Sequence, residues 1–368
     1  MTGKELTARE RRVYDALQDE LSRDIFWSRN GFGAKWQPLY EQGFDAYNDP
    51  PQELAIDDSF WKYLEDEHNS IASLERRVIG KKVVIYGYAY SGRAIQKRLE
   101  YLGLGGNIVA VWDRNPQLLG VSVGSRVVEA PPQSGADVPD IDLIIVCSGS
   151  FAQEIHDFLL SLGIVDSKIF SPYWVNQSEE HFDAEIIVPR LVNDEIFIDG
   201  GVMNFDTSLN LLKLNYGVKK IYAFEPDPAN FRLAAKAVAE SGFANVDLRQ
   251  AGWGSERAKL KWKSDGGGSH VDENSSLEVD VYAIDDIIPE NEKVTFIKLD
   301  VEGLELEVLK GAARTIRQCK PKLAISIYHK PFDYYELPEY ILSLVPEYKV
   351  YMRHPSSMPS GTDCYFVL

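Results

Sequence analysis

Residues 195–201 read EIFIDGG, a short apolar run that ends in an aspartate and two glycines, and a helical pattern over 204–215 follows. A run of this length before glycines is typical of a buried parallel strand that turns directly into a helix. In doubly wound sheets, ligands bind beyond the carboxyl ends of the strands, where glycine permits a tight turn and a close approach to the backbone. The stretch therefore predicts a βα unit with a binding site at Asp199.

The same alternation of strand and helix continues from about residue 183 to residue 368. The pattern predicts further strands at 219–226, 245–254, 277–284, 294–303, 321–330, 348–354 and 363–368. Helical patterns lie between several of them, at 228–241, 305–319 and 335–344. Alternating strands and helices predict a parallel sheet with helices on its faces.

A second unit of the same kind precedes this one. Residues 80–175 also alternate strand and helix, starting with KKVVIYG at 81–87, and predict a Rossmann-like domain. Residues 1–79 show helical patterns, with Thr7 and Glu10 spaced as a capping box, and predict a helical segment for packing or for dimerisation into a homo-oligomer. The predicted fold class is α/β, with two Rossmann-like doubly wound domains behind an N-terminal helical segment.

The composition excludes several classes of function. The chain carries 56 acidic and 39 basic side chains, a net charge of -17 that repels phosphate backbones and anionic membrane surfaces, so neither nucleic acid nor a membrane is an expected partner. No apolar run reaches the length of about 18 residues that a spanning helix needs. The first residues lack the apolar core of a secretory signal. Three scattered cysteines, Cys147, Cys319 and Cys364, fit no disulfide framework, so a reduced, cytoplasmic protein is expected.

The first two strand ends of the C-terminal unit indicate a nucleoside site. Asp199 is placed to attract the ammonium and sulfonium of a methionine moiety, and Asn204 to hydrogen-bond its carboxylate. Glu225 closes the next strand, where a carboxylate accepts hydrogen bonds from both ribose hydroxyls. Gly200 and Gly201 do not continue into the G-x-G-x-x-G spacing that seats a dinucleotide pyrophosphate. A nucleoside without phosphates therefore fits better than NAD.

Charged side chains also end the strands that follow. Lys298, Asp300 and Glu302 alternate at and beyond the end of one predicted strand, and His329 ends the next. The carboxyl ends of parallel strands meet at one edge of the sheet, so Asp300 and His329 are expected to converge on one substrate. An unperturbed imidazole titrates near neutrality, which makes His329 the first candidate for a general base. Asp300 is the second candidate.

Four motifs, in this order and spacing, resemble the FkbM family of methyltransferases: FIDGG (197–201), AFEP (223–226), IKLDVEGLELEVLKGA (297–312) and SIYHKP (326–331). The resemblance covers roughly residues 183–368, and LDVEG is its most distinctive part. It implies a class I methyltransferase sheet, S-adenosylmethionine as the methyl donor, and O-methylation of a hydroxyl on a sugar or natural product. Many members read D-x-G-A-N-x-G where this chain reads DGGVMNF, so the donor contacts at this turn are expected to differ.

Under this interpretation the cofactor contacts are expected at Asp199, Gly200, Gly201, Asn204, Glu225, Asp227, Ala251 and Gly252. The expected catalytic set is His329, Asp300 and Glu302. A divalent ion held by Asp300 and Glu302 would lower the pKa of the acceptor hydroxyl, but two neighbouring carboxylates are not a metal signature, and the metal is left open. The expected partner is a small-molecule or carbohydrate acceptor.

The N-terminal Rossmann-like unit predicts a second nucleotide site. Gly87 and Gly92 match G-x-x-x-x-G with Ala89 at the middle position, and Asp113 ends the second strand. The pattern resembles the N-terminal domains of sugar-modifying acyltransferases and sugar dehydratases, which implies a nucleotide or nucleotide-sugar ligand. Ala89 places a methyl where a pyrophosphate would approach, which disfavours NAD. Two alternatives to a methyltransferase stay open: an NAD- or nucleotide-sugar-binding oxidoreductase that uses this unit, and a binding protein without catalysis.

Overall fold

A computed structural model of the protein describes residues 6–41, 77–148, 151–171, 181–215, 217–264, 269–354 and 361–368. The chain folds into two units, each with a parallel sheet of its own. The C-terminal unit comprises Met1–Trp27, Ser178–His354 and Thr362–Leu368, and the N-terminal unit comprises Ser28–Gln177 and Pro355–Gly361. Both sheets follow from the predicted alternation of strands and helices.

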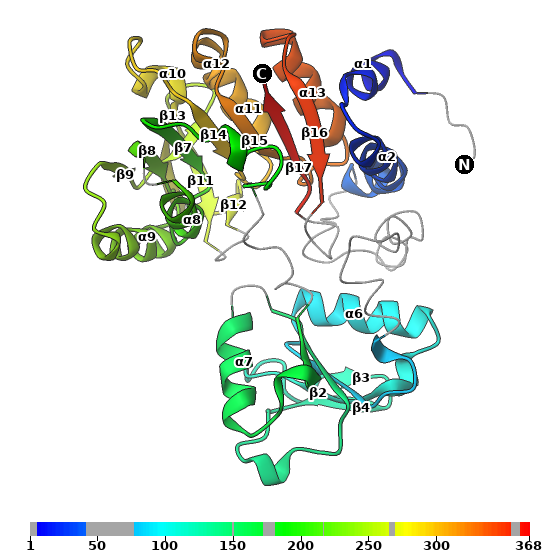
Figure 1. The fold of residues 1–368 in the computed structure, drawn as a ribbon. Helices are drawn as coiled ribbons and strands as arrows, with labels where there is room; N and C mark the ends of the chain where they lie inside the picture. The colour runs from blue at the N-terminus through cyan, green and yellow to red at the C-terminus, as the bar shows by residue number, and fades with distance from the viewer. Residues whose placement is uncertain are drawn as a thin grey trace. The chain divides into compact units, whose positions relative to one another are not determined.

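A seven-stranded sheet is the centre of the C-terminal unit (Figure 1). In spatial order its strands are β16 (Lys349–Arg353), β17 (Asp363–Val367), β15 (Lys322–Ser326), β14 (Phe296–Leu299), β7 (Glu195–Gly200), β8 (Val218–Phe224) and β9 (Val246–Arg249). The strands from β15 to β9 pair in parallel, and β17 pairs antiparallel with both neighbours. The chain leaves β7 toward β8 and later returns to β14 on the other side. The strand order therefore reverses between β7 and β14, which is where doubly wound sheets bind ligands.

Continuous apolar runs place these strands inside the unit. Every side chain of β7, β14 and β17 is buried, as is typical of strands covered on both faces. Phe197 and Phe296 contact each other across β7 and β14 with ring centroids 5.0 Å apart. They share one apolar cluster with Phe182 and Tyr365. This core fixes the two strands whose ends form the switch point.

Helices connect the strands of this sheet. They are α8 (Asp206–Leu214), α9 (Pro228–Ser241), α10 (Ile284–Ile287), α11 (Glu305–Gly311), α12 (Ala313–Cys319) and α13 (Asp333–Leu344), with a 3-10 turn at Val188–Arg190. The helix predicted at 305–319 is thus two helices, α11 and α12. Among the described residues, no helix is both long and apolar enough to span a lipid bilayer.

A separate four-stranded sheet belongs to the same unit. Its order is β10 (Gly252–Gly254), β13 (Leu277–Ala283), β11 (Ala258–Lys263) and β12 (His270–Val271). The sequence pattern did not separate these strands from the main sheet. In β13, exposed Glu278 and Asp280 alternate with buried apolar residues. Such alternation suits a sheet with one open face and not a parallel strand covered on both sides.

The N-terminal helices are shared between the two units. α1 (Ala8–Ala16) begins at Thr7, and the predicted capping box with Glu10 is confirmed. Glu10 is buried and accepts a hydrogen bond from Tyr334 Oη of α13 at 2.6 Å. α2 (Glu20–Tyr40) runs across the boundary after Trp27. The contacts thus assign α1 to the C-terminal unit, whereas the sequence pattern grouped residues 1–79 together. Residues 1–5 and 42–76 of that segment lie outside the described residues.

The N-terminal unit contains a six-stranded sheet in the order β3 (Ser122–Val123), β4 (Arg126–Glu129), β2 (Ile108–Trp112), β1 (Val83–Tyr86), β5 (Leu143–Val146) and β6 (Ile169–Phe170). All pairs are parallel except β3 with β4. Its helices are α6 (Tyr90–Tyr101) and α7 (Ala152–Ser161), with 3-10 turns at Gly105–Asn107, Gly135–Asp137 and Asp166–Lys168. Two apolar clusters divide the side chains of β1 and β5 between them, as expected for a sheet covered on both faces.

The turn after β7 requires a glycine. Gly201 has φ +81°, and a Cβ there would stand 1.7 Å from the carbonyl oxygen of Asp300. Gly242, after α9, has φ +71° with nothing within 4 Å of such a Cβ. We expect Gly242→Ala to lower the free energy of unfolding by about 1–2 kcal/mol, the cost of the left-handed backbone alone. Gly201→Ala adds steric overlap with the backbone of Asp300, so its free energy of unfolding should fall by at least about 3 kcal/mol. Urea denaturation compares the variants, and equal losses would contradict the close packing of this turn.

Candidate active site

A cleft opens at the carboxyl ends of β7, β8 and β14, at the switch point of the main sheet. It is lined by Gly201, Met203, Phe224, Glu225, Pro226, Asn230, Gly252, Trp253, Trp262, Ser269, Val281, Asp300, Val301, Glu302 and Leu304. Five predicted site residues are among them: Gly201, Glu225, Gly252, Asp300 and Glu302. The switch point thus brings together both sets of strand-end acids that the sequence pattern singled out.

A buried lysine holds the glycine turn in place. Lys298 lies opposite Asp199 in the register of β14 and β7, and it is 2% exposed. Its Nζ donates hydrogen bonds to the carbonyl oxygens of Gly200 at 3.1 Å and Gly201 at 2.7 Å. The same ammonium lies 3.4 Å from Asp199 Oδ1. A desolvated charge needs such compensation, so the turn and the lysine fix each other.

Asp199 belongs to the framework of the cleft and not to its lining. It is fully buried, and its Oδ2 accepts a hydrogen bond from Ser208 Oγ of α8 at 2.7 Å. Together with the ion pair to Lys298, this contact ties the end of β7 to the following helix. The sequence pattern expected this carboxylate to face a ligand ammonium. The structure instead directs it toward α8 and β14.

Two residues with left-handed backbone shape the turn into α8. Met203 has φ +51° and Phe205 has φ +75°, and the side chain of Phe205 is fully buried. The amide of Met203 donates a hydrogen bond to Glu225 Oε2 at 2.8 Å. Asn204 does not line the cleft, because its side chain bonds Asp206, with Nδ2 donating to the carboxylate at 2.6 Å. The turn therefore offers backbone, and not the Asn204 amide, to the cleft.

Two backbone amides orient the side chain of Glu225 in the cleft. It is 4% exposed, and its Oε1 accepts a hydrogen bond from the Asp227 amide at 2.8 Å while Oε2 accepts from Met203. Burial raises the pKa of Glu225 to about 7, although both amide hydrogen bonds favour the ionised form. A carboxylate oxygen has two lone pairs, so each oxygen keeps acceptor capacity for a ligand hydroxyl.

Three other predicted cofactor residues, Asp227, Ala251 and Gly252, lie near Glu225 and have structural roles around the cleft. Asp227 is the N-cap of α9 and accepts hydrogen bonds from the amides of Ala229 and Asn230, so its carboxylate serves the helix. Ala251 is buried and does not line the cleft. Gly252 does, and a Cβ there would come within 3.1 Å of Val281. Gly252 therefore keeps the wall close to β13.

An aromatic wall on the side of Glu225 was not predicted from the sequence. Phe224 and Trp253 stack with ring centroids 3.6 Å apart, and Trp262 of β11 lines the same cleft. Flat apolar walls of this kind suit a planar ligand group. Phe224 and Trp253 adjoin predicted site residues in the sequence, which was the available signal. Trp262 carries no such signal, because only the separate sheet brings β11 to the cleft.

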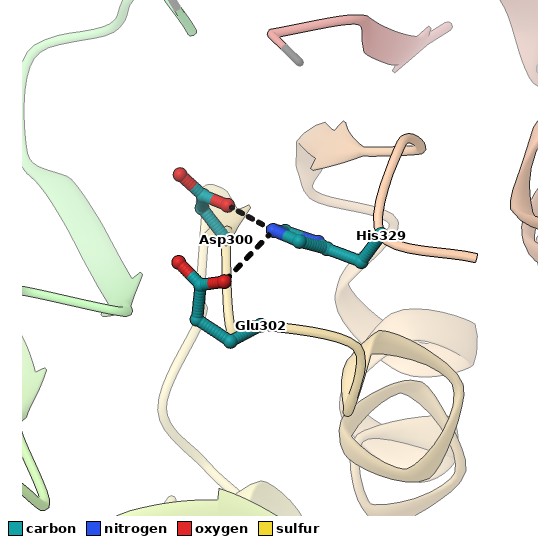
Figure 2. A group of neighbouring side chains, drawn as sticks. All are labelled: Asp300, Glu302 and His329. Atoms are coloured by element: carbon teal, nitrogen blue, oxygen red, sulfur yellow. Dashed lines mark ion pairs between the residues drawn. The ribbon is translucent and has the colours of Figure 1, made fainter. Parts of the chain in front are cut away.

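The other end of the cleft holds Asp300, Glu302 and His329 (Figure 2). His329 Nε2 lies 3.4 Å from Asp300 Oδ1 and 3.5 Å from Glu302 Oε2. The predicted convergence of Asp300 and His329 is what the structure shows, and Glu302 joins them. The side chain of Asp300 is 22% exposed, that of Glu302 is 34% exposed, and that of His329 is 6% exposed. The two carboxylates therefore face the cleft, and the imidazole lies behind them.

A third carboxylate lies on the far side of the imidazole. Glu305 is 1% exposed, and its Oε1 is 3.0 Å from His329 Nδ1. Burial favours a neutral imidazole, but the charges of Glu305, Glu302 and Asp300 outweigh it and raise the pKa of His329 to about 10. In this arrangement His329 is charged at neutral pH, which does not suit the general base that the sequence pattern predicted first.

Asp300 stays ionised at neutral pH. Burial opposes its charge, but the positive charges of His329, Lys298 and His181 outweigh burial and lower the pKa of Asp300. Tyr328 Oη also donates a hydrogen bond to Asp300 Oδ1 at 3.0 Å. The cleft therefore presents an ionised carboxylate that can accept a hydrogen bond from a hydroxyl group. The sequence analysis did not predict His181 and Tyr328, because their role here is to stabilise the charge of Asp300.

The predicted second site in the N-terminal unit consists of turn residues. Gly87 has φ +95°, and a Cβ on Gly92 would stand 2.0 Å from the Gly87 carbonyl oxygen. Asp113 Oδ2 accepts a hydrogen bond from the Tyr88 amide at 2.6 Å, and Ala89 is exposed at the start of α6. Strand-to-helix packing thus accounts for both glycines and the aspartate. A nucleotide ligand here stays a prediction.

A sheet of this order, with an antiparallel final pair and a cleft at the switch point, is a class I methyltransferase sheet. Residues 194–352 match the family model described as the methyltransferase FkbM domain. The match confirms the resemblance carried by the four motifs. The N-terminal Rossmann-like unit lies outside the matched residues. No curated protein matches the chain.

Solved structures are similar to the chain at low identity. Methyltransferase FkbM from Methylobacillus flagellatus KT is 20% identical with a TM-score of 0.47, over 80% of this chain and 92% of that one. Aeropyrum pernix fibrillarin, in complex with S-adenosyl-L-methionine, is 13% identical with a TM-score of 0.32, over 52% and 73%. M. jannaschii TYW2, in complex with AdoMet, is 13% identical with a TM-score of 0.28, over 52% and 74%. The substrate therefore has to be argued from the site itself.

Loss of the buried lysine should be costly. Lys298→Met leaves Asp199 buried without its ion pair and the two glycine carbonyls without their donor, and we expect unfolding free energy to fall by about 3–5 kcal/mol. Lys259→Met, at a 63% exposed side chain, is the control and should change it by less than about 0.5 kcal/mol. The double variant Asp199→Asn/Lys298→Met should be more stable than Lys298→Met alone, because it no longer buries an unpaired carboxylate. Strict additivity in denaturant unfolding would argue against the ion pair.

Proposed function

We propose that the C-terminal unit is an S-adenosylmethionine-dependent O-methyltransferase, acting on a hydroxyl of a sugar or natural-product acceptor. One observation carries the proposal: the carboxylate of Glu225, held by two backbone amides at the end of β8, lines the cleft at the switch point. A carboxylate at this position accepts hydrogen bonds from the two hydroxyls of a ribose. The family match supports methyl transfer.

The rest of the cleft suits the other parts of this donor. The adenine lies against the apolar wall that includes Trp253 and Trp262, beside the ribose. The methionine tail extends toward Gly201, which lines the cleft beside Met203. The sulfonium then lies between the Glu225 end of the cleft and its Asp300 end. The ionised carboxylate of Asp300 favours a cationic ligand group.

Methyl transfer follows from this placement. The carbon–sulfur bond of the donor breaks with its electrons going to sulfur, a carbon–oxygen bond forms to the acceptor hydroxyl, and the hydroxyl proton is released. Asp300 lines the cleft as an ionised carboxylate, so it orients this hydroxyl and accepts its proton. Alignment of the two reactants contributes up to about 7–11 kcal/mol in favourable cases. The site therefore relies more on position than on a strong base.

The acceptor class comes from the family resemblance and from the polar end of the cleft. Hydroxyl-rich acceptors suit carboxylates that accept hydrogen bonds, such as those of Asp300 and Glu302. The other expectations also remain proposals: a cytoplasmic location, no nucleic-acid or membrane partner, and a homo-oligomer. They rest on the composition and on the N-terminal helical segment alone.

Calorimetry with S-adenosylhomocysteine tests the donor site. The full-length protein should bind this product, and Glu225→Ala should weaken binding by at least about tenfold, because charge-assisted hydrogen bonds contribute about 1.5–3 kcal/mol each. Glu240→Ala, at a 67% exposed side chain of α9, is the matched control and should bind normally. Failure of the folded protein to bind S-adenosylhomocysteine would overturn the proposal. Binding of NAD alone would favour an oxidoreductase instead.

The pH dependence of binding tests the role of Glu225 directly. Ribose hydroxyls need the ionised carboxylate, and a pKa of about 7 means that the ionised fraction falls about tenfold between pH 8 and pH 6. The dissociation constant for S-adenosylhomocysteine should therefore rise by up to about tenfold over this range. Glu225→Gln should remove this pH dependence.

The stability contribution of Glu225 should fall as the pH rises, whereas the affinity for S-adenosylhomocysteine should increase. The folded-state pKa of Glu225 lies above its ordinary value of 4.5, so its contribution is present below pH 4.5 and is lost as the pH rises through about 7. Thermal denaturation of the wild type and Glu225→Gln, followed from pH 5 to pH 8, compares the two slopes. Identical slopes in both proteins would show that burial does not perturb this carboxylate.

A further inference from the structure

We propose that Asp300, Glu302 and His329 bind a divalent cation of the Mg²⁺ or Mn²⁺ class at the acceptor end of the cleft. The three side chains each offer one ligand atom, and these atoms all lie within 4.8 Å of one another. Figure 2 shows one oxygen of each carboxylate directed toward the same imidazole nitrogen, Nε2 of His329. The ligands come from the end of β14, the turn before α11, and the end of β15.

The spacing of the ligand atoms fits an octahedral ion. With metal–ligand distances of about 2.1 Å, neighbouring ligand atoms around Mg²⁺ lie about 3 Å apart. The observed separations of 3.4 Å and 3.5 Å from His329 Nε2 to the two carboxylates are close to this value. A small rotation of either carboxylate brings its oxygen into range. The remaining positions of such an ion face the cleft, where water or a ligand oxygen completes the coordination.

A second observation independently favours a metal ligand at His329. The carboxylate of Glu305 stands 3.0 Å from Nδ1, and it is itself held by the amides of Val301 at 2.9 Å and Gly303 at 3.4 Å. Metal-binding histidines usually donate their second ring nitrogen to a carboxylate, which fixes the tautomer and directs the other nitrogen at the metal. Binding of the ion would therefore release the Nε2 proton that His329 carries without a metal. Glu305 is 1% exposed and takes this supporting position.

The donor set also selects the class of ion. Two carboxylates and one imidazole are hard to borderline ligands, and no thiolate takes part, since all three cysteines lie outside this group. Carboxylate-rich sites with room for water suit Mg²⁺ and Mn²⁺ better than soft metals. Asp300 and Glu302 both line the cleft, so an ion can enter from solvent while His329 stays buried. The net charge of -17 adds a general attraction for cations.

The consequence for catalysis rests on the proposed function. An ion at this place would coordinate the acceptor hydroxyl and lower its pKa, so that the proton is lost more easily as the carbon–oxygen bond forms. An acceptor with two adjacent oxygens, such as a vicinal diol of a sugar, would occupy two coordination positions. The site thereby deepens the proposal from a hydroxyl acceptor to a chelating one.

Manganese binding tests the site without any turnover. Full-length protein, freed of metal with a chelator, is titrated with Mn²⁺ at physiological ionic strength, and free Mn²⁺ is followed by electron paramagnetic resonance. We expect one saturable site per chain and at least tenfold weaker binding in Glu302→Gln and Asp300→Asn. Glu307→Gln, at a 45% exposed acid of α11, is the matched control and should bind like the wild type.

Pulsed resonance identifies the ligand. Electron spin echo modulation should show nitrogen coupling from His329 in the Mn²⁺ complex, which exposed carboxylates cannot produce. Several weak sites without nitrogen coupling, or unchanged affinity in Glu302→Gln, would overturn the proposal. Titration with S-adenosylhomocysteine in the presence of chelator separates the two hypotheses: donor binding without Mn²⁺ uptake defeats only the metal site, and Mn²⁺ uptake without donor binding defeats only the proposed function.

Discussion

The buried ammonium of Lys298 is the contact on which the cleft depends. It lies between two strands at the switch point, bonds the carbonyls of Gly200 and Gly201, and pairs with Asp199. A desolvated charge tolerates little displacement, so the end of β7 is fixed against the end of β14. The turn that follows then brings the Met203 amide to the carboxylate of Glu225. The shape of the cleft is thus set by a residue that does not line it.

Two carboxylates in one cleft differ in their ionisation because their surroundings differ. Glu225 is surrounded by apolar walls and backbone amides, and burial raises its pKa to about 7. Asp300 faces Lys298, His181 and His329, whose positive charges lower its pKa below the ordinary value. Two carboxylates whose surroundings push their pKa values apart can perform different tasks. One end of the cleft suits neutral sugar hydroxyls, and the other suits cations.

Strand-end positions made much of the site predictable. Glu225, Asp300 and His329 follow apolar runs, and parallel strands end at one edge, so their convergence could be inferred from the sequence. The orientation of Asp199 toward α8 and the carboxylate behind His329 could not, because they depend on how helices pack on the sheet. The alternating pattern of β13 was visible in the sequence, yet nothing local showed that it forms a separate sheet.

The position of β17 has a consequence for biosynthesis. This strand, at residues 363–367, lies inside the sheet between β15 and β16, although it follows both in the sequence. A ribosome has to release these residues before β16 gains its partner and before the edge of β15 is covered. The sheet of the N-terminal unit is complete in sequence by Phe170 and can form much earlier. The nascent chain therefore carries an open strand edge, prone to aggregation, until residues 363–367 have emerged.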